Sequence, residues 1–431
     1  MILNLVFFFS FIYCQSVNSF EFQKLKTESG IEFWFVEDKS IPIVSLSYSF
    51  KGGASLDHDN KAGISNLMTS LMDEGTRNLS ASEFKDLMKI NGMKMYFSTE
   101  KDRIDGVFQI ITSQIDDGFS LFYEALNHPR FDEREIEKIK KQIEASIRID
   151  ESDIPKIASD KFNHFFFNKH SFSRKVKGTL DSITRISKDD LISFHKEAFT
   201  RNNLNIGVAG NVSERQIKKY VEMVFGKLSN AGESRRLETF PPMPSGKEFY
   251  KIETPQTTVL FGHSGLSRND KNFFAIRIAN YVLGGGGFQS RLYKNIREKR
   301  GLVYSVYSYL LSYQNDGVII GGFRTRNKSV TETIKRVRDE WKKIERKGIT
   351  KNELDDAKAY YNGSFTRNFT STLSIAKLLQ IVQYYNLGEN YFEERKELID
   401  SLKLDEINNL ISEFFKSEEL FFMIVGDPEK K

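Results

Sequence analysis

The chain has 431 residues, of which 39% are apolar and 28% are charged, and its formal net charge is +5. This length buries more core than one domain usually holds, so two or more domains are expected. Lysines and arginines are scattered among aspartates and glutamates, which argues against a nucleic-acid partner, because phosphate binding needs a concentrated basic stripe. The 37 Phe and 17 Tyr against 8 Pro indicate large sheets covered by helices.

Residues 1–19 begin with an apolar run and continue with small and polar residues. The run is too short to span a bilayer, and the pattern predicts a secretory signal peptide that is cut after Ser19. A buried first strand is the alternative, because no Lys or Arg precedes the run. Tyr13 before Cys14 is too bulky for lipoprotein processing, so we expect an exported protein without a stable membrane anchor. In a Gram-negative source it would be periplasmic.

Apolar periodicity predicts the elements of the first half. Alternation at every second residue indicates strands, and helical spacing indicates helices. Strands are expected over 31–36, 43–50, 93–98 and 106–112, and helices over 63–73, 81–90, 114–126 and 133–149. Ser80 and Glu83 form a Ser-x-x-Glu capping pattern at the start of the second helix. This mixture favours an α+β fold with a largely antiparallel sheet.

The second half repeats features of the first at a separation of a little over two hundred residues. Asn-Ile-Gly-Val-Ala-Gly-Asn at 205–211 is answered by Phe-Met-Ile-Val-Gly-Asp at 422–427, and Asp-Gly-Val at 105–107 is answered by the same residues at 316–318. Each match alone is weak. Together, and in order, they favour two homologous domains, each a largely antiparallel sheet covered by helices. The expected boundaries are 20–228 and 248–431, joined by a linker over 229–247.

The segment Lys-Ala-Gly-Ile-Ser-Asn-Leu-Met-Thr-Ser-Leu-Met-Asp-Glu-Gly-Thr at 61–76 resembles the signature helix of the pitrilysin and insulinase family of inverted zincins. In active members this helix carries His-x-x-Glu-His, whose imidazoles hold zinc and whose glutamate activates water. Those places fall on Asn66, Thr69 and Ser70, and the family's third ligand aligns with Ser146. Asn, Thr and Ser are poor zinc ligands. The resemblance therefore implies vacated positions and no metal or other cofactor in this chain.

The six histidines offer no replacement site, because no two of them stand three or four residues apart. A second departure from the family lies at Met95 and Tyr96. Active members often carry Asn-Ala there, on a strand to which substrate adds, so substrate pairing along the first domain is in doubt.

A glycine run, Gly284, Gly285, Gly286 and Gly287, precedes Phe288. No Gly-Lys-Ser/Thr follows it, so a phosphate cradle is a weak interpretation. The segment that follows resembles the family's second-domain signature, which includes an arginine and a tyrosine, here Arg297 and Tyr304. In the family this pair holds substrate and donates to the carbonyl oxygen as it gains charge. The resemblance implies catalytic roles for the pair and substrate contacts for the glycine run and Phe288.

A plainer interpretation treats Arg297 as a solvated helix charge and Tyr304 as a strand aromatic packed on the core. Because both residues occur in register with the glycine run, we favour a functional role for them instead. The leading hypothesis is the non-catalytic subunit of a heterodimeric zinc peptidase of the bacterial processing-peptidase-like branch, supplying the pair in trans to a zinc-bearing partner that cleaves peptides. The alternatives are a structural or assembly subunit and, more remotely, a zinc peptidase with rearranged ligands.

Overall fold

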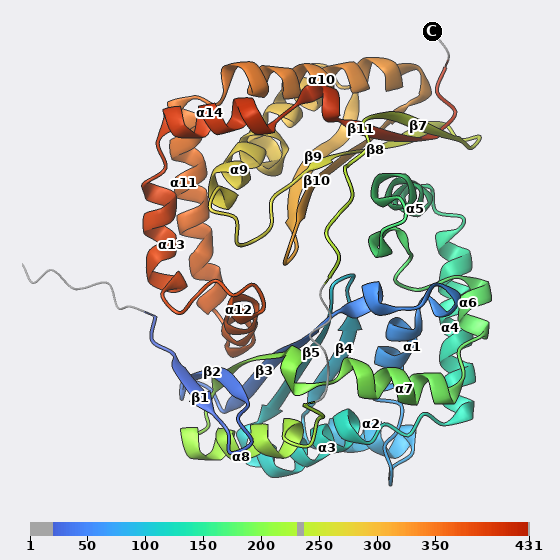
Figure 1. Cartoon of the computed structure of the whole chain (residues 1–431), viewed down its shortest axis with the longest axis vertical. Helices are drawn as coiled ribbons and strands as arrows, with labels where there is room; N and C mark the ends of the chain where they lie inside the picture. The colour runs from blue at the N-terminus through green and yellow to red at the C-terminus, as the bar shows by residue number, and fades with distance from the viewer. Residues whose placement is uncertain (1–19, 231–236, 430–431) are drawn as a thin grey trace, which may run out of the picture.

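The structure is a computed structural model that describes residues 20–230 and 237–429. The segment interpreted as a signal peptide lies outside the described residues. The described chain folds into two sheets, each with its own covering of helices (Figure 1). The expected α+β fold with two homologous, largely antiparallel sheets is confirmed. None of the described helices is long and apolar enough to cross a membrane.

The first sheet has the strand order β1-β2-β6-β3-β5-β4. Among its described strands only β2 and β6 run parallel. Its strands are β1 Gln23–Lys26, β2 Glu32–Glu37, β3 Ile43–Lys51, β4 Lys94–Thr99, β5 Arg103–Ile111 and β6 Leu204–Gly210. Its helices are α1 Ile64–Leu71, α2 Ala81–Ile90, α3 Ile115–Asn127, α4 Glu133–Asp150, α6 Leu180–Thr184, α7 Lys188–Ala198 and α8 Glu214–Phe225.

The second sheet has the strand order β7-β11-β8-β10-β9. Its strands are β7 Gly246–Lys251, β8 Gln256–Ser264, β9 Val303–Ser312, β10 Gly317–Arg326 and β11 Phe421–Gly426. Its helices are α9 Phe273–Asn280, α10 Val330–Lys347, α11 Lys351–Phe365, α13 Tyr391–Asp400 and α14 Leu404–Phe414. The strand β11 is parallel to β7 and antiparallel to β8, just as β6 is parallel to β2 and antiparallel to β3. The two motifs matched by sequence at 205–211 and 422–427 therefore occupy corresponding strands.

Local signals in the first half agree with the structure. The four expected strands and four expected helices are present within a few residues of their predicted bounds. Ser80 and Glu83 form the expected capping box at the start of α2. The apolar residues of α1, among them Leu67, Met68 and Leu71, are buried in the core of the first half. The polar side of α1 contacts β4, where the Thr99 hydroxyl donates to the Ser65 carbonyl and meets the Thr69 hydroxyl.

Each half lends one helix to the other half's sheet. Helix α5 (Ile154–Phe167) packs on β8 and β11, and helix α12 (Thr372–Tyr384) packs on β3 and β6 (Figure 1). Gly207 permits the second contact, because a Cβ there would overlap the backbone carbonyl of Ala376. The two halves are therefore interlocked rather than merely linked.

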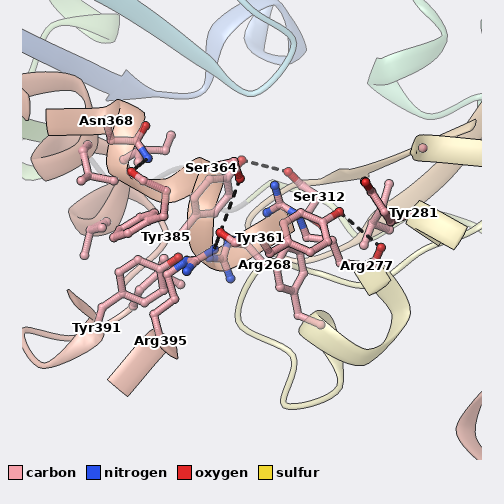
Figure 2. Close-up of a pocket in the computed structure, with 18 of the residues that line it drawn as sticks. Arg268, Arg277, Tyr281, Ser312, Tyr361, Ser364, Asn368, Tyr385, Tyr391 and Arg395 are labelled. Carbon is pink, nitrogen blue, oxygen red and sulfur yellow. Dashed lines mark hydrogen bonds between the residues drawn. The ribbon is translucent and has the colours of Figure 1, made fainter. Parts of the chain in front are cut away.

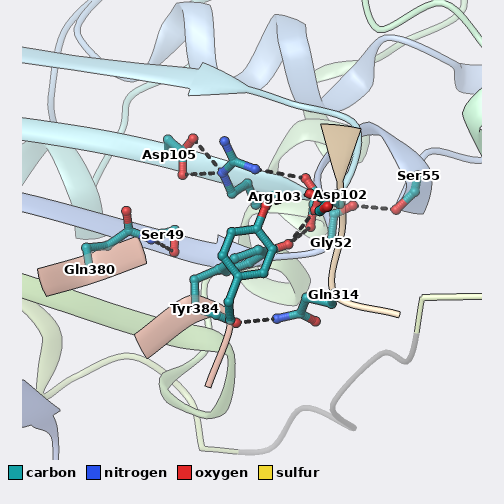
Figure 3. Close-up of polar contacts among 11 residues, drawn as sticks. Ser49, Gly52, Ser55, Asp102, Arg103, Asp105, Gln314, Gln380 and Tyr384 are labelled. Carbon is teal, nitrogen blue, oxygen red and sulfur yellow. Dashed lines mark hydrogen bonds and ion pairs between the residues drawn. The ribbon is translucent and has the colours of Figure 1, made fainter. Parts of the chain in front are cut away.

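Polar groups join α12 to the first sheet (Figure 3). The Tyr384 hydroxyl donates to an oxygen of the buried Asp102 carboxylate at 2.8 Å. Arg103 contacts the same carboxylate at 3.2 Å and Asp105 at 2.8 Å. One turn before Tyr384 on α12, the amide of Gln380 donates to the Ser49 hydroxyl. These contacts set how the second half sits on the first.

Candidate functional site

The vacated zinc positions on α1 are closed by local hydrogen bonds. The Ser70 hydroxyl donates to the Asn66 carbonyl at 2.8 Å, and the Thr69 hydroxyl donates to the same carbonyl at 3.1 Å. Thr69 also lies 3.1 Å from the Thr99 hydroxyl of β4. Hydroxyl groups engaged in this way satisfy the helix and the adjacent strand. They present no imidazole or carboxylate to a metal.

The fourth vacated position is contacted by a lysine. The Lys177 ammonium donates to the Ser146 hydroxyl at 2.7 Å and pairs with Asp150, one turn farther along α4, also at 2.7 Å. A cation at this point repels a second cation. The arrangement at α1 and α4 therefore does not fit zinc. Sequence reasoning identified Ser146 but missed Lys177, which lies thirty-one residues away in the chain.

Asp57 is a second residue that sequence reasoning missed. One of its carboxylate oxygens accepts from the Gly63 backbone N–H at 2.7 Å and the other accepts from the Ser65 N–H at 3.3 Å, so this side chain fixes the start of α1. Burial raises the pKa of Asp57 to about 7, although these hydrogen bonds act in the opposite direction. Its role is to position the helix.

No group of three His, Cys, Asp or Glu side chains in residues 20–230 and 237–429 is placed to hold a metal ion. His195, for example, is engaged with the Leu126 carbonyl at 2.8 Å. Burial lowers the pKa of His195 to about 4. The interpretation as a zinc peptidase with rearranged ligands thus finds no ligand set in the part of the chain that the structure describes.

The residues singled out in the second half are close together. The Arg297 guanidinium lies 4.9 Å from the centre of the Tyr304 ring and 4.7 Å from that of Tyr293, to whose hydroxyl it also donates. The Phe288 and Tyr293 rings meet edge to face at 4.9 Å. We call Phe288, Tyr293, Arg297 and Tyr304 the aromatic–arginine stack. Because Tyr304 is 83% exposed and Phe288 70% exposed, the stack is open to a ligand.

The backbone around the stack is unusual. Arg297 belongs to a π-helical segment, Tyr293–Glu298, and the glycine run begins in another, Tyr281–Gly285. Such segments are rare in proteins, and those that occur often lie at functional sites. The chain leaves the helix at Gly301, whose φ is +58°, and enters β9, which carries Tyr304. Gly301 thereby brings Arg297 and Tyr304 to the same place.

The glycines of the run differ in their surroundings. Gly284 is buried, and a Cβ there would collide with Ser308 of β9, so it allows close packing on that strand. Gly285 and Gly286 are half-buried, while Gly287 is exposed, has a φ of +56° and has open space around it. Of the run, Gly287 and the adjoining Phe288 face solvent most openly. A direct substrate contact for each of these residues stays a prediction.

The vacated positions and the stack belong to different halves. Helix α1 packs against β4, α4 and α7, whereas the segment that carries Arg297 packs against β9 and α10. On β4, Met95 is buried and Tyr96 is half exposed.

Two family profiles match adjoining parts of the sequence. Residues 34–180 match the profile described as Insulinase (Peptidase family M16), and residues 185–361 match the one described as Peptidase M16 inactive domain. A solved structure described as the peptidase M16 inactive domain from Pseudomonas fluorescens superposes with a TM-score of 0.90. It is 24% identical and covers 95% of this chain and 98% of its own. This likeness establishes the fold.

Two named relatives match over almost the whole chain. The Helicobacter pylori protein named non-peptidase homolog YmxG is 29% identical over 402 residues, which is 92% of each chain. The Bacillus subtilis protein named uncharacterized zinc protease YmxG is 25% identical over 404 residues, 92% of this chain and 96% of that one. The two names disagree on peptidase activity. The residues of the site have to decide that question.

Proposed function

Because the chain belongs to the M16 insulinase family, we propose that it is the zinc-less subunit of a two-chain peptidase, supplying Arg297 and Tyr304 to a zinc-bearing partner. The single observation that carries this proposal is the contrast between the halves. The first half has lost every ligand position and holds Lys177 there, while the second half keeps Arg297 beside an exposed Tyr304. Loss of the metal site without loss of the pair is the pattern expected of a subunit that acts in trans.

The chemistry assigned to this chain is binding and electrostatic stabilisation. Arg297 carries a fixed positive charge and several N–H donors, and Tyr304 carries a hydroxyl donor. Donors directed at a peptide carbonyl oxygen stabilise the negative charge that develops there during hydrolysis. Tyr293 helps to hold the guanidinium in place, because it accepts a hydrogen bond from Arg297. The zinc of the partner would supply the activated water.

The proposal also covers location and substrate. We infer that the chain is exported by the segment at 1–19 and works in a periplasm-like compartment on peptides. The exposed Phe288 and the adjoining Gly287 offer a surface along which a peptide backbone can lie close to the protein.

The test is reconstitution with a zinc-bearing family member from the same source. The purified chain should carry no stoichiometric zinc by elemental analysis and should cleave no peptide, and the mixture should be active. Arg297→Ala should lower kcat/KM of the mixture by about a hundredfold. Lys299→Ala removes an exposed positive charge from the same turn and serves as the matched control, which should leave activity unchanged.

Tyr304→Phe separates the hydroxyl from the ring. It should lower kcat/KM by about tenfold or more while the stacking on Arg297 persists. Full activity in both variants, with normal binding of the partner, would show a structural or assembly subunit instead. Zinc bound tightly by the chain alone would contradict the proposal outright.

A further inference from the structure

A cavity of about 580 Å³ lies in the second half, apart from the vacated zinc positions. It is bounded by α9, α11, α12, α13 and β9, and its wall includes the side chains of Arg268, Arg277 and Arg395 (Figure 2). A space of this size accepts a small ligand or the end of a peptide.

Among the residues that the structure describes, the three arginines have no acidic partners. No Asp or Glu lines the cavity, and within the described residues none of the three forms an ion pair at the 4.0 Å limit. Arg395 is only 7% exposed, whereas Arg268 and Arg277 are half-buried. Buried arginines are normally paired with carboxylates, because an unpaired buried charge is costly. One buried and two half-buried arginines around one space form an excess of positive charge that an anion would neutralise.

The arginines are held in place by rings and single hydrogen bonds. The Arg268 guanidinium lies 4.0 Å from the Phe273 ring centre and donates to the Tyr391 hydroxyl at 2.6 Å. Arg395 lies 4.2 Å from the Phe365 ring centre and donates to the Tyr361 carbonyl at 2.9 Å. Stacking of this kind uses the faces of the guanidinium and leaves most of its N–H donors at the edge.

Arg277 also packs against aromatic rings. Its guanidinium lies 4.8 Å from the Tyr361 ring centre and 5.5 Å from that of Phe273. Burial lowers the pKa of both Arg268 and Arg395, and the charge of Arg277 lowers each further. The three charges therefore repel one another across the cavity. Packing against aromatic rings alone would be served equally well by neutral side chains.

The cavity is lined in part by chain segments that also contribute to the region proposed to bind substrate. Tyr281 and Gly285, of the π-helical segment Tyr281–Gly285 that begins the glycine run, line it, and so does Tyr309 of β9. The same segment leads to Phe288, and the same strand carries Tyr304. The aromatic–arginine stack and the cavity therefore draw residues from neighbouring parts of the same two segments.

We propose that this cavity binds the carboxylates of an acidic peptide segment, with Arg268, Arg277 and Arg395 as the recognising groups. The choice of a peptide over a phosphate compound rests on the proposed function, whereas the preference for an anion rests on the cavity alone. Guanidinium groups match carboxylates through paired N–H donors. The peptides handled at this site carry negative charge.

The test is calorimetric titration of the full chain, without any partner, with the tripeptide Glu-Glu-Glu. Gln-Gln-Gln amide is the uncharged counterpart, and inorganic pyrophosphate is the phosphate probe. The acidic tripeptide should bind, more weakly as salt is added, and the neutral peptide should not. Arg277→Gln should weaken binding by about tenfold or more. Arg215→Gln, which removes an exposed arginine of α8, should have no effect.

Arg277→Lys keeps the charge and loses the paired donors, so its affinity should lie between those of the wild type and Arg277→Gln. Absence of tripeptide binding, equal binding by Arg277→Gln, or binding of pyrophosphate alone would each overturn the inference. Because the titration needs neither zinc nor turnover, its failure beside a working reconstitution would leave the proposed function standing. Binding of the tripeptide together with a failure to reconstitute peptidase activity would contradict the proposed function and leave only an anion-binding site.

Discussion

The two lent helices meet their sheets through different chemistry. Helix α5 contributes Phe162 and Phe166 to an apolar cluster with Phe421, Met423 and Val425 of β11. Helix α12 instead meets a row of buried serines on β3 and the carboxylate of Asp102, through Thr372, Gln380 and Tyr384. Apolar burial supplies most of the free energy, whereas hydrogen bonds between buried groups restrict the geometry. The α5 contact therefore contributes mainly to the free energy of folding, and the α12 contact mainly fixes the orientation of the helix on the first sheet.

A similar division runs through the chemistry of the two halves. The first half has hydroxyls and an ammonium at the positions that carry metal ligands in active members of the family, and the second half has arginines beside tyrosines, one of them the exposed Tyr304. Under the proposed function, the duplicated scaffold carries a silent surface in one half and a binding surface in the other. Four measurements probe this contrast.

The largest effect is expected from the aromatic contact. Phe166→Ala should lower the free energy of unfolding by about 4 kcal/mol, because it leaves a cavity between α5 and the second sheet. Phe165→Ala, the adjacent and 40% exposed residue, should cost about 1 kcal/mol or less. Denaturant unfolding measures both. Equal losses in the two variants would show that α5 is not anchored by this face.

The polar contact should be somewhat less costly to break. Asp102→Ala should destabilise the protein by about 3 kcal/mol, since it removes the buried carboxylate that accepts from the Tyr384 hydroxyl, leaving only the backbone carbonyl of residue 102 at 3.2 Å, and since it removes one partner of Arg103. Asp105→Ala removes the other partner, which is 26% exposed, and should cost about 1 kcal/mol. A smaller loss for Asp102 than for Asp105 would contradict the alignment role given to Asp102.

Two buried groups of the first half should give opposing responses to pH. The pKa of Asp57 is raised to about 7 from 3.8, so ionisation opposes folding and this group favours the fold as pH falls from about 7 to about 4. The pKa of His195 is lowered to about 4 from 6.5, so protonation favours the unfolded chain over about the same range. The wild-type stability should therefore change little between about pH 7 and pH 5.

Single variants should uncover each response. On moving from about pH 7 to pH 5, Asp57→Asn should lose about 2 kcal/mol of stability and His195→Gln should gain a similar amount. Urea unfolding at the two pH values gives the comparison. A variant whose pH response matched that of the wild type would show that the substituted group does not titrate as described.

The smallest effect concerns rebuilding the vacated site. A variant with Asn66→His, Thr69→Glu, Ser70→His and Ser146→Glu carries the family's ligands, but Lys177 remains beside position 146. Adding Lys177→Met should tighten zinc binding by about tenfold, because a competing cation is removed. The control is Lys175→Met. Lys175 lies in the same loop as Lys177, and its substitution breaks the ion pair with Asp160 of α5. Competition with a chromophoric chelator measures the zinc affinities. If Lys177→Met did not tighten zinc binding, the Lys177 ammonium would not be what opposes the metal.

Short-range signals account for most of what the sequence predicted. The capping box at Ser80, the alternation along β3 and the turn at Gly301 depend on neighbouring residues, so they are visible in the sequence. The family motifs likewise led to Arg297 and Tyr304, which the fold brings together. These features require no knowledge of distant contacts.

The features that escaped prediction depend on residues far apart in the chain. Alternation along β3 predicts one face toward the core and one toward water, yet Ser45, Ser47 and Ser49 are buried because α12 covers them. Lys177 reaches Ser146 across a helix and a loop. The arginines of the cavity come from separate elements. No local sequence pattern predicts these contacts between distant residues.

The lent helix α12 also has a consequence for synthesis of the chain. The first sheet has all its strands once Gly210 has left the ribosome, but its covering helix begins only at Thr372. Until then the serine face of β3 is open, and the nascent first half is a partly covered sheet exposed to other chains. A fragment that stops before α12 should therefore need a chaperone or aggregate, and the full fold becomes secure only near the end of translation.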